Sequence, residues 1–400
     1  MYFSLLGGIL SDAEAFPLPA ELKLNLTSHT PVVETSKEVI IGELVAQSIM
    51  EGIGDIHSPV CGTISEICPD FIRIQTSQGI EEAEPLVIST ENQGNIRKSL
   101  RLLGIDSEKY VPSHYLVISG VNEEPQIYTR EQALFSFPKD VKEGIEVLKK
   151  LVLPTETILI LPDGAEYGNL DPLVWLDAKS VIKVNPVHPA GIVELIAKKA
   201  TDKETIEDAV VVGVDELAWI GRAFKEKKPF TEKVWTLLGK NYLIKIGTKI
   251  SDLLKVAKIE PQKGDKLIFG GPMRGTAQYT EEASISKHDN GLCLIKAGAF
   301  VSIGERPCIN CGECTRNCPA RLQIHLIGRF AEFSQFEHAR KYSVQSCFEC
   351  GICGYICPAR RPLVQYVRLL KEEIKKIDEQ AKKNQANTVA TSPIKKGERD

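Results

Sequence analysis

The sequence predicts a multidomain protein in which β and α/β domains precede a C-terminal helical module. Three observations support this fold class. The chain has 400 residues, which exceeds the size of one ordinary hydrophobic core. Strand patterns alternate with helix patterns in its middle part, and eight of its eleven cysteines fall within residues 308–357.

Residues 1–90 have the pattern of a small β domain. Short apolar or alternating runs, such as Val60 to Ile64 and Phe71 to Ile74, are separated by glycine and proline. Strands of this length and spacing are typical of a small barrel or sandwich.

Residues 91–225 change to an α/β pattern. Four apolar runs, which begin at Tyr115, Thr157, Ser180 and Ala209, have the composition of strands, and the run at Tyr115 that of a buried one. Helical patterns follow these runs, and such alternation predicts a layered domain with parallel strand pairs.

The rest of the chain divides into four stretches. Residues 226–275 return to β character with one short helix, and residues 276–304 look like an irregular linker. Residues 305–378 hold the cysteine-rich module. Residues 379–400 are polar, rich in lysine and without aromatic side chains, so we expect a disordered tail.

The cysteines form two runs with the same spacing, C-x2-C-x2-C-x3-C-P. The first run is Cys308, Cys311, Cys314 and Cys318, and the second is Cys347, Cys350, Cys353 and Cys357. A cubane iron–sulfur cluster needs four thiolates that point inward from different directions. In two-cluster ferredoxins the fourth cysteine of each run binds the other cluster.

This rule predicts two [4Fe–4S] clusters with crossed ligation. Cluster 1 takes Cys308, Cys311, Cys314 and Cys357, and cluster 2 takes Cys347, Cys350, Cys353 and Cys318. Crossed ligation makes the clusters neighbours, so electrons can pass between them. A pair of structural zinc sites is the alternative, but zinc usually takes two C-x2-C pairs per site.

Helical spacing connects the two motifs. Leu326, Ile327, Phe330 and Phe333 recur on one helical face, and a similar apolar series follows the second motif. We therefore predict a helical ferredoxin module, in which this apolar and aromatic stripe packs in the core.

The composition of the chain limits the partners it can have and the cell compartment in which it can work. A net charge of −4 gives no reason to expect a nucleic-acid partner. No apolar run reaches about eighteen residues, so we expect no membrane-spanning helix, and the first eight residues do not resemble a secretory signal. Cysteines at metal-ligand spacing indicate a reducing compartment, the cytoplasm.

Three motifs together resemble one family. Phe269-Gly-Gly-Pro-Met-Arg-Gly275 precedes Glu305-Arg-Pro-Cys308, and Ile56 to Ile64 lies far upstream. Combined with the two cysteine runs, they are similar to RnfC, the peripheral subunit of Rnf-type ferredoxin:NAD oxidoreductases. The resemblance extends over residues 5–372.

The resemblance implies a domain order and a setting. Residues 1–90 would form a barrel-sandwich domain, residues 91–225 an α/β domain like the flavoprotein subunit of complex I, and residues 226–275 an SLBB-type β-grasp domain. The partners would be other subunits of a redox complex, among them a flavoprotein or a ferredoxin. That complex would be soluble or lie on the cytoplasmic face of a membrane.

The chain departs from the family at the flavin loop. Members that bind FMN and NAD(H) carry a G-x-G-G-A-G-F-P loop before the strand that here begins at Tyr115. The segment Ser99 to Pro112 contains one glycine, Gly104. Without glycines that let backbone amides approach phosphates, no cradle for FMN is evident. The acidic motif after the strand is reduced to Glu123 and Glu124, which we expect in a solvated turn.

These features predict an electron-transfer subunit whose two clusters are its redox centres. We assign no catalytic residue and no cofactor-binding residue beyond the eight cysteines, and the sequence leaves open whether the chain is an enzyme. The alternative is an FMN-dependent NAD(H) oxidoreductase subunit with a divergent nucleotide-binding loop.

Overall fold

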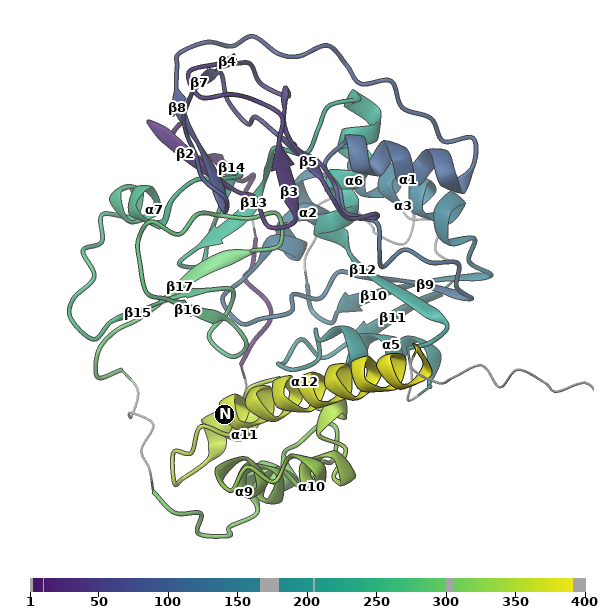
Figure 1. Ribbon diagram of the computed structural model, residues 1–400, viewed down its shortest axis with the longest axis vertical. Helices are drawn as coiled ribbons and strands as arrows, with labels where there is room; N and C mark the ends of the chain where they lie inside the picture. Colours follow the sequence, from purple (N-terminus) through teal and green to yellow (C-terminus); the bar gives the residue numbers. More distant parts are fainter. Residues whose placement is uncertain (1–2, 10, 166–179, 204–205, 300–305, 391–400) are drawn as a thin grey trace, which may run out of the picture. The chain divides into compact units, whose positions relative to one another are not determined.

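The computed structural model describes residues 3–9, 11–165, 180–203, 206–299 and 306–390, with side chains up to residue 384. The chain divides into two compact units, Met1–Ala299 and Phe300–Asp400. Figure 1 traces them in purple to green and in green to yellow.

The first unit begins with two antiparallel sheets, as the short apolar runs predict. One has the order β2 (Glu21–Asn25), β8 (Phe71–Thr76), β7 (Gly62–Ile67) and β4 (Glu38–Val39). The other consists of β3 (His29–Pro31), β5 (Leu44–Ser48) and β6 (Ile56–His57). Alternate residues of the strands point into a shared core, whose members include Leu22, Leu24, Val45, Ile64, Ile72 and Ile74.

A parallel four-stranded sheet follows, at the four predicted runs. Its strands are β9 (Tyr115–Ser119), β10 (Glu156–Pro162), β11 (Ser180–Val184) and β12 (Ala209–Gly213). Their spatial order is β11-β10-β9-β12, and every pair is parallel. The chain therefore runs outward from β9 and then crosses back to its other side. This topology places a switch point between β9 and β12, where α/β sheets usually bind ligands.

Helices cover both faces of this sheet (Figure 1). One core joins the sheet to α1 (Gln93–Leu102), α2 (Thr129–Ser136), α3 (Pro138–Val152) and α6 (Val214–Glu226). A second core joins the opposite face to α5 (Val193–Thr201) and to Leu5. Helices α3 and α6 lie so close that a Cβ atom on Gly144 or Gly221 would clash with the other helix's backbone.

The third part of this unit is a mixed six-stranded sheet. Its order is β1 (Glu14–Ala15), β14 (Lys240–Lys245), β13 (Glu232–Leu237), β17 (Gly291–Ile295), β15 (Lys266–Phe269) and β16 (Thr276–Gln278). Helix α7 (Ile250–Ala257) packs its apolar side into the same core as Trp235.

Two of these strands correct an expectation. Residues 276–304 were expected to be an irregular linker, but β16 and β17 lie within that range. Strand β17 pairs with β13 on one side and with β15 on the other, so it is an interior strand. Its five-residue run Gly291–Ile295 is bounded by turn residues and is too short to show a clear period, which is why pattern reading misses it.

The second unit is helical, as predicted. Its elements are α8 (Glu313–Arg316), α9 (Ile324–Glu332), α10 (Phe336–Lys341), the 3₁₀ turn η1 (Val344–Ser346), α11 (Ile352–Ile356) and α12 (Leu363–Ala390). The core between them includes Ile324, Ile327, Leu363, Val367 and Leu370.

Two expectations for this unit are wrong. Helix α12 continues to Ala390 in a region expected to be disordered, and residues 391–400 lie outside the described part. Ala, Glu, Gln and Lys dominate this extension, and they are strong helix formers. Phe333, expected in the core, follows the end of α9 and is 68% exposed. Among the described residues, no helix has the length and apolarity needed to cross a bilayer.

Candidate iron–sulfur site

The two cysteine motifs share one backbone conformation. Each motif has a glycine after its second cysteine, Gly312 or Gly351, with φ of 77° and 83°. These glycines cap α8 and α11, which carry the third cysteines. At such positive φ an L side chain is strained, so the motif requires glycine there. The turn thereby brings three thiols of one motif to the same side of a short helix.

The repetition extends to residues that are not glycine. Asn310 and Glu349, each just before the second cysteine, have φ of 55° and 53°. Arg321 and Arg360, each three residues after the fourth cysteine, have φ of 53° and 56°. Left-handed residues other than glycine are uncommon. Their recurrence at matching positions indicates that both loops are built around the same kind of group, a signal that sequence pattern alone does not show.

The first set of thiols surrounds one cavity. Cys308, Cys311 and Cys314 of the first motif line it together with Cys357 of the second motif. Cys314 and Cys357 are buried, whereas Cys308 and Cys311 are partly exposed. Burial raises the pKa of Cys314, and the nearby thiols of Cys357 and Cys308 raise it further. Four cysteines from two motifs thus meet in the grouping that crossed ligation predicts.

The second set combines Cys318 with the cysteines of the second motif. Burial raises the pKa of Cys350 to about 11, and the neighbouring thiols of Cys347 and Cys318 add to this shift. Burial likewise raises the pKa of Cys353, with contributions from Cys350, Cys347 and Cys318. Cys318 therefore lies among the thiols of the second motif.

Backbone amides point at two of these sulfurs. The amide of Leu322 donates to Sγ of Cys318, and the amide of Glu349 donates to Sγ of Cys347, both at 3.4 Å. Hydrogen bonds to cluster sulfurs raise the reduction potential. The loops therefore supply both thiolates and the donors that adjust their electron density.

The chemistry of the donor set fits a cubane. Within the ranges that the structure describes, no three His, Cys, Asp or Glu side chains converge on a point suited to one metal ion. A cubane makes a different demand, because its four thiolates bind separate irons and must surround a volume. Each set holds four thiols, and metal binding to such desolvated thiols would release their protons.

Charged side chains of α12 brace the second set. Lys371 Nζ donates to the carbonyl of Cys347 at 2.7 Å and to Glu349 at 2.8 Å. Arg368 Nε donates to the other oxygen of Glu349 at 2.9 Å. The loop that carries Cys347 is therefore fixed to α12 by two cations that share the carboxylate of Glu349, which leaves this group with a net positive charge.

A different group of side chains, which meets at Glu332, lies beside the first thiol set. Arg361 lines its cavity, is 5% exposed and forms an ion pair with Glu332 of α9. Tyr366 also donates a hydrogen bond to Glu332, at 3.2 Å.

Cys61, Cys68 and Cys293 lie in the first unit, away from both motifs in the sequence, and Cys61 and Cys293 are buried.

Comparison with known proteins agrees with these two sets of thiols. Residues 300–387 match the family described as "4Fe-4S dicluster domain". The RnfC subunit of the ion-translocating oxidoreductase complex of Yersinia enterocolitica is 31% identical over 287 residues, which cover 67% of this chain and 41% of that protein. Its counterpart in Buchnera aphidicola is 28% identical, with 83% of this chain and 75% of that protein covered. The chain belongs to the RnfC-like family.

The match does not extend over whole relatives. The matched part spans under half the length of the Yersinia protein. In Pectobacterium carotovorum the corresponding protein is 29% identical, over 92% of this chain and 56% of that protein. Among solved structures, an NAD⁺-reducing [NiFe]-hydrogenase in the air-oxidized state aligns with a TM-score of 0.37 at 12% identity, covering 70% of this chain and 50% of that chain.

In this RnfC-like chain, Arg130 occupies the switch point of the parallel sheet. Arg130, on α2, is 7% exposed and forms ion pairs with Glu123 after β9 and with Asp215 after β12, the latter at 3.5 Å. Its guanidinium also donates to the carbonyl of Val121 at 2.8 Å. The crevice between β9 and β12 is therefore filled by the chain's own charged side chains.

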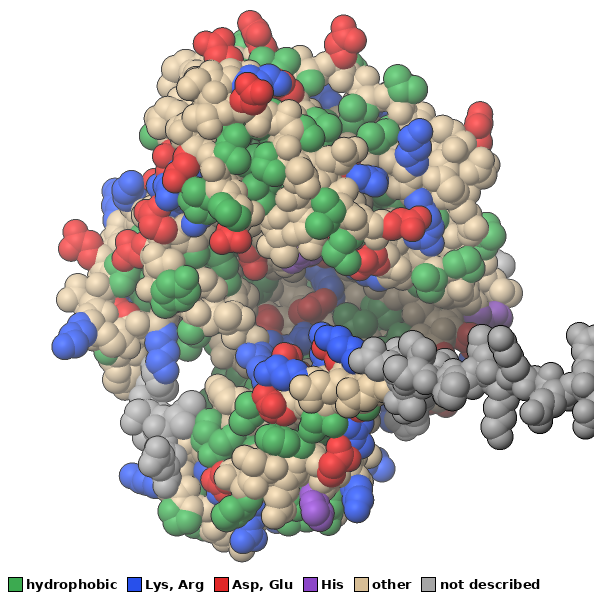
Figure 2. All heavy atoms as spheres, viewed as in Figure 1, with side chains coloured by type: hydrophobic (Ala, Val, Ile, Leu, Met, Phe, Trp, Pro, Cys, Tyr) green, Lys and Arg blue, Asp and Glu red, His purple; other side chains and the backbone are tan. Residues whose placement is uncertain are grey.

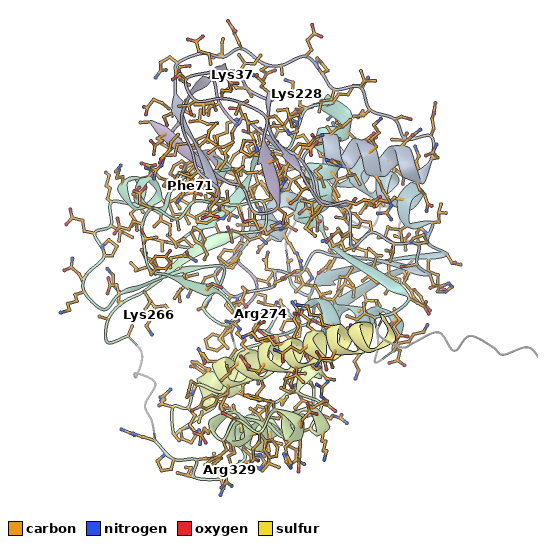
Figure 3. The ribbon with its side chains drawn as sticks, in the orientation of Figure 1. Lys37, Phe71, Lys228, Lys266, Arg274 and Arg329 are labelled. Carbon is orange, nitrogen blue, oxygen red and sulfur yellow. The ribbon has the colours of Figure 1, made fainter. Side chains whose placement is uncertain are left out.

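The acidic pair after β9 corrects another expectation. Glu124 was expected in a solvated turn but is 7% exposed. Its Oε2 accepts the amide of Met273 at 3.0 Å, and Gly271 has no room for a Cβ atom beside it. Burial raises the pKa of Glu124 to about 7. The Gly270–Gly275 loop thus closes over Glu124, and Arg274 (Figure 3) lies 3.6 Å from Glu123.

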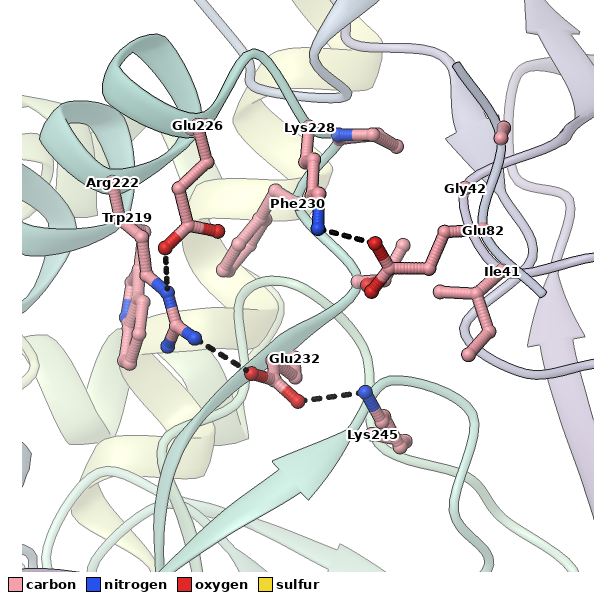
Figure 4. Close-up of a pocket in the computed structure, with 14 residues that line it drawn as sticks. Ile41, Gly42, Glu82, Trp219, Arg222, Glu226, Lys228, Phe230, Glu232 and Lys245 are labelled. Atoms are coloured by element: carbon pink, nitrogen blue, oxygen red, sulfur yellow. Dashed lines mark hydrogen bonds and ion pairs between the residues drawn. The ribbon is translucent and has the colours of Figure 1, made fainter. Parts of the chain in front are cut away.

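Another cavity of this RnfC-like chain, of about 170 Å³, is lined by charges that neutralise one another (Figure 4). Arg222 pairs with Glu226 and Glu232, and Lys245 pairs with Glu232 at 2.7 Å. Lys228 pairs with Glu82 there as well. On the face that Figure 2 shows, the first unit likewise has mixed acidic and basic side chains. These features suit a joint between segments of one chain better than an anion site.

Proposed function

We propose that the chain is an electron-transfer subunit of an RnfC-type redox complex, which carries single electrons through two [4Fe–4S] clusters. The observation that carries the proposal is the cavity lined by Cys308, Cys311, Cys314 and Cys357. Its fourth thiol comes from the other motif, which is the arrangement that two-cluster ferredoxins use.

The second set completes the proposal. Cys347, Cys350 and Cys353 would hold the second cluster with Cys318, whose charge affects two of them. Because each motif would contribute one ligand to the other's cluster, the two clusters would lie next to each other. The chain's residues bind and orient the clusters and donate hydrogen bonds to sulfur, while the electron moves from iron to iron.

We further propose that the α/β domain does not bind FMN or NAD(H). The switch point at which such ligands usually bind holds Arg130 and its two carboxylate partners. The preceding segment contains only Gly104. A nucleotide phosphate could reach Arg130 in this crevice only by displacing Glu123 and Asp215, which would leave both carboxylates without their partner.

The other domains would dock the clusters within the complex. We assign residues 1–90 to a barrel-sandwich domain and the six-stranded sheet to an SLBB-type β-grasp domain, which extends past residue 275 to include β17. The partners would be other subunits, and the setting would be the cytoplasm or the cytoplasmic face of a membrane complex.

Iron content and electron transfer test the proposal together. The full chain, reconstituted without oxygen, is expected to bind roughly eight irons, as two [4Fe–4S] clusters require. A ferredoxin-level donor should reduce both clusters, as seen by EPR, and an added acceptor should reoxidise them within turnover time. If the clusters were reduced by the donor but not reoxidised by the acceptor, their role in this protein would be structural only.

Cofactor analysis separates this function from the flavin enzyme. Acid extraction should release no stoichiometric FMN, and NADH should not drive dye reduction. If FMN appears at about one per chain together with NADH-dependent activity, the chain is an FMN-dependent oxidoreductase subunit, and Arg130 must then move out of the crevice.

A further inference from the structure

An open cavity of about 560 Å³ lies beside the first thiol set. Its lining includes Cys308, Arg306, Arg329, Arg361, Phe333 and Tyr366. Cys308 is partly exposed and lines both this cavity and the one that the four thiols share. This surface therefore leads from solvent directly to a proposed cluster ligand.

The cavity carries unneutralised positive charge. Arg361 is neutralised by Glu332, the only acidic residue in its described lining. Arg306 and Arg329 are exposed, and no ion pair to either is found among the described residues. Figure 3 shows Arg329 projecting from α9. The second thiol set differs in that both of its nearby cations, Lys371 and Arg368, are held in ion pairs, although they share the one carboxylate of Glu349.

Large apolar side chains accompany the two arginines. Phe333 in the cavity wall is 68% exposed, and Ile309, next to Cys308, is 65% exposed. Exposed aromatic and arginine side chains together are typical of the energetic centres of protein interfaces. A small anion could neutralise the arginines but would leave these apolar side chains in water, so a protein partner fits the surface better.

The net charge of the cysteine module indicates the sign of the partner's net charge. Residues 306–384 contain 14 Lys and Arg against 8 Asp and Glu, whereas the whole chain has a net charge of −4. Two [4Fe–4S]²⁺ clusters on eight thiolates would add about four negative charges, so the loaded module would keep an excess of about two positive charges, while the rest of the chain is acidic. Such a field accelerates encounter with an acidic protein and slows encounter with a basic one.

We propose that the face formed by Arg306, Ile309, Arg329 and Phe333 docks a small acidic redox protein, which exchanges one electron with the cluster held by Cys308. This rests on the proposed electron-transfer function. In the forward step the reduced partner loses one electron and a [4Fe–4S]²⁺ cluster becomes [4Fe–4S]⁺. No bond is made or broken.

Charge reversal on the full reconstituted chain tests the docking face. The double variant Arg306→Glu/Arg329→Glu removes the positive pair. Lys375→Glu makes a smaller change of the same sign on α12, on an exposed residue about 13 Å along the helix from Tyr366. A third variant, Lys375→Glu/Lys382→Glu, matches the double variant's total charge, because Lys382 is also exposed.

Stopped-flow mixing with a photoreduced acidic ferredoxin gives the second-order rate constant. At low ionic strength the arginine variant should be slower than wild type by about 10-fold or more, and the lysine variants should stay within about 2-fold. Added salt should slow wild type and leave the arginine variant nearly unchanged. With a basic cytochrome as acceptor, the arginine variant should instead be faster.

The outcomes separate the two proposals. Equal rates for the arginine and lysine variants, or no reaction of wild type with the ferredoxin, would overturn the docking face. Reduction of all variants by photoreduced deazaflavin, which is uncharged, would show that the clusters still accept electrons. If wild-type clusters accept none from deazaflavin either, the electron-transfer function itself fails.

Discussion

Nε of Arg130 lies 3.5 Å from the carboxylate of Asp215, between the carboxyl ends of β9 and β12. Burial by itself would raise the pKa of Asp215, but the charge of Arg130 and a hydrogen bond from Thr129 hold it below its ordinary value. The chain thus places a buried ion pair where related α/β folds leave room for a ligand.

Replacing Arg130 should destabilise the first unit strongly. Arg130→Met leaves Asp215 buried without its partner, which costs about 3–5 kcal/mol. Lys149→Met, which removes an exposed pair with Glu146 on α3, should cost under about 1 kcal/mol. Urea unfolding followed by tryptophan fluorescence measures both. Adding Asp215→Asn to Arg130→Met should recover part of the loss, and a loss no larger than that of Lys149→Met would show that the pair contributes little.

Glu124 should make stability depend on pH. Its pKa is raised from 4.5 to about 7 in the folded chain, so the folded state binds more protons between these values. Stability therefore falls as pH rises through this window. Glu124→Gln stays neutral and keeps an acceptor for Met273. At pH 8 it should be more stable than wild type by about 3 kcal/mol, and near pH 4.5 the difference should vanish.

Thermal unfolding at several pH values measures this effect. Glu143→Gln, at an exposed position on α3, is the matched control and should follow wild type at every pH. His57 acts in the opposite direction, because burial lowers its pKa to about 4 and stability is lost as pH falls below about 6.5. A Glu124→Gln curve parallel to wild type would rule out a buried proton on Glu124.

Crossed ligation predicts which cysteine variants behave alike. Cys357→Ser should remove the same EPR signal as Cys314→Ser, although they lie in different motifs. Cys318→Ser should instead match Cys353→Ser. Each variant is expected to retain roughly four irons. If Cys357→Ser removed the same EPR signal as Cys353→Ser, each cluster would take all four ligands from one motif, and the ligation would not be crossed. Cys68→Ser, in the first unit, serves as the control.

Lys371 should tune one cluster. Its positive charge lies beside Cys347, and its removal in Lys371→Met should lower the reduction potential of the second-motif cluster by about 10–40 mV, the equivalent of a weak exposed charge interaction. An EPR-monitored redox titration measures the shift. Lys375→Met, one turn further along α12, should leave both potentials unchanged, and equal shifts in the two variants would point to a general charge effect.

The sequence predicts the parts of this protein in which local pattern determines structure. The runs at Tyr115, Thr157, Ser180 and Ala209 all form parallel strands, and the two interior strands, β9 and β10, are buried and have the continuous apolar runs that burial on both faces needs. The cysteine spacing likewise predicts the grouping of Cys357 with the first motif, because in motifs of this spacing the fourth cysteine serves the other cluster.

Tertiary contacts decide what the pattern misses. An acidic pair before a proline has the local character of an exposed turn, and only the loop that returns about 150 residues later buries Glu124. Arg130 is similar, because nothing next to it in the sequence shows that its partner Asp215 follows β12. Strand β17 depends on pairing with β13, which lies more than 50 residues earlier.

The position of β17 has a mechanical consequence. This strand is hydrogen-bonded on both sides, to β13 and to β15, and it ends at Ile295, before the cysteine module that begins at residue 305. Both ladders must therefore break before this strand is released. An edge strand could instead be peeled away one bond at a time. The C-terminal end of the first unit is thus held by two ladders rather than one.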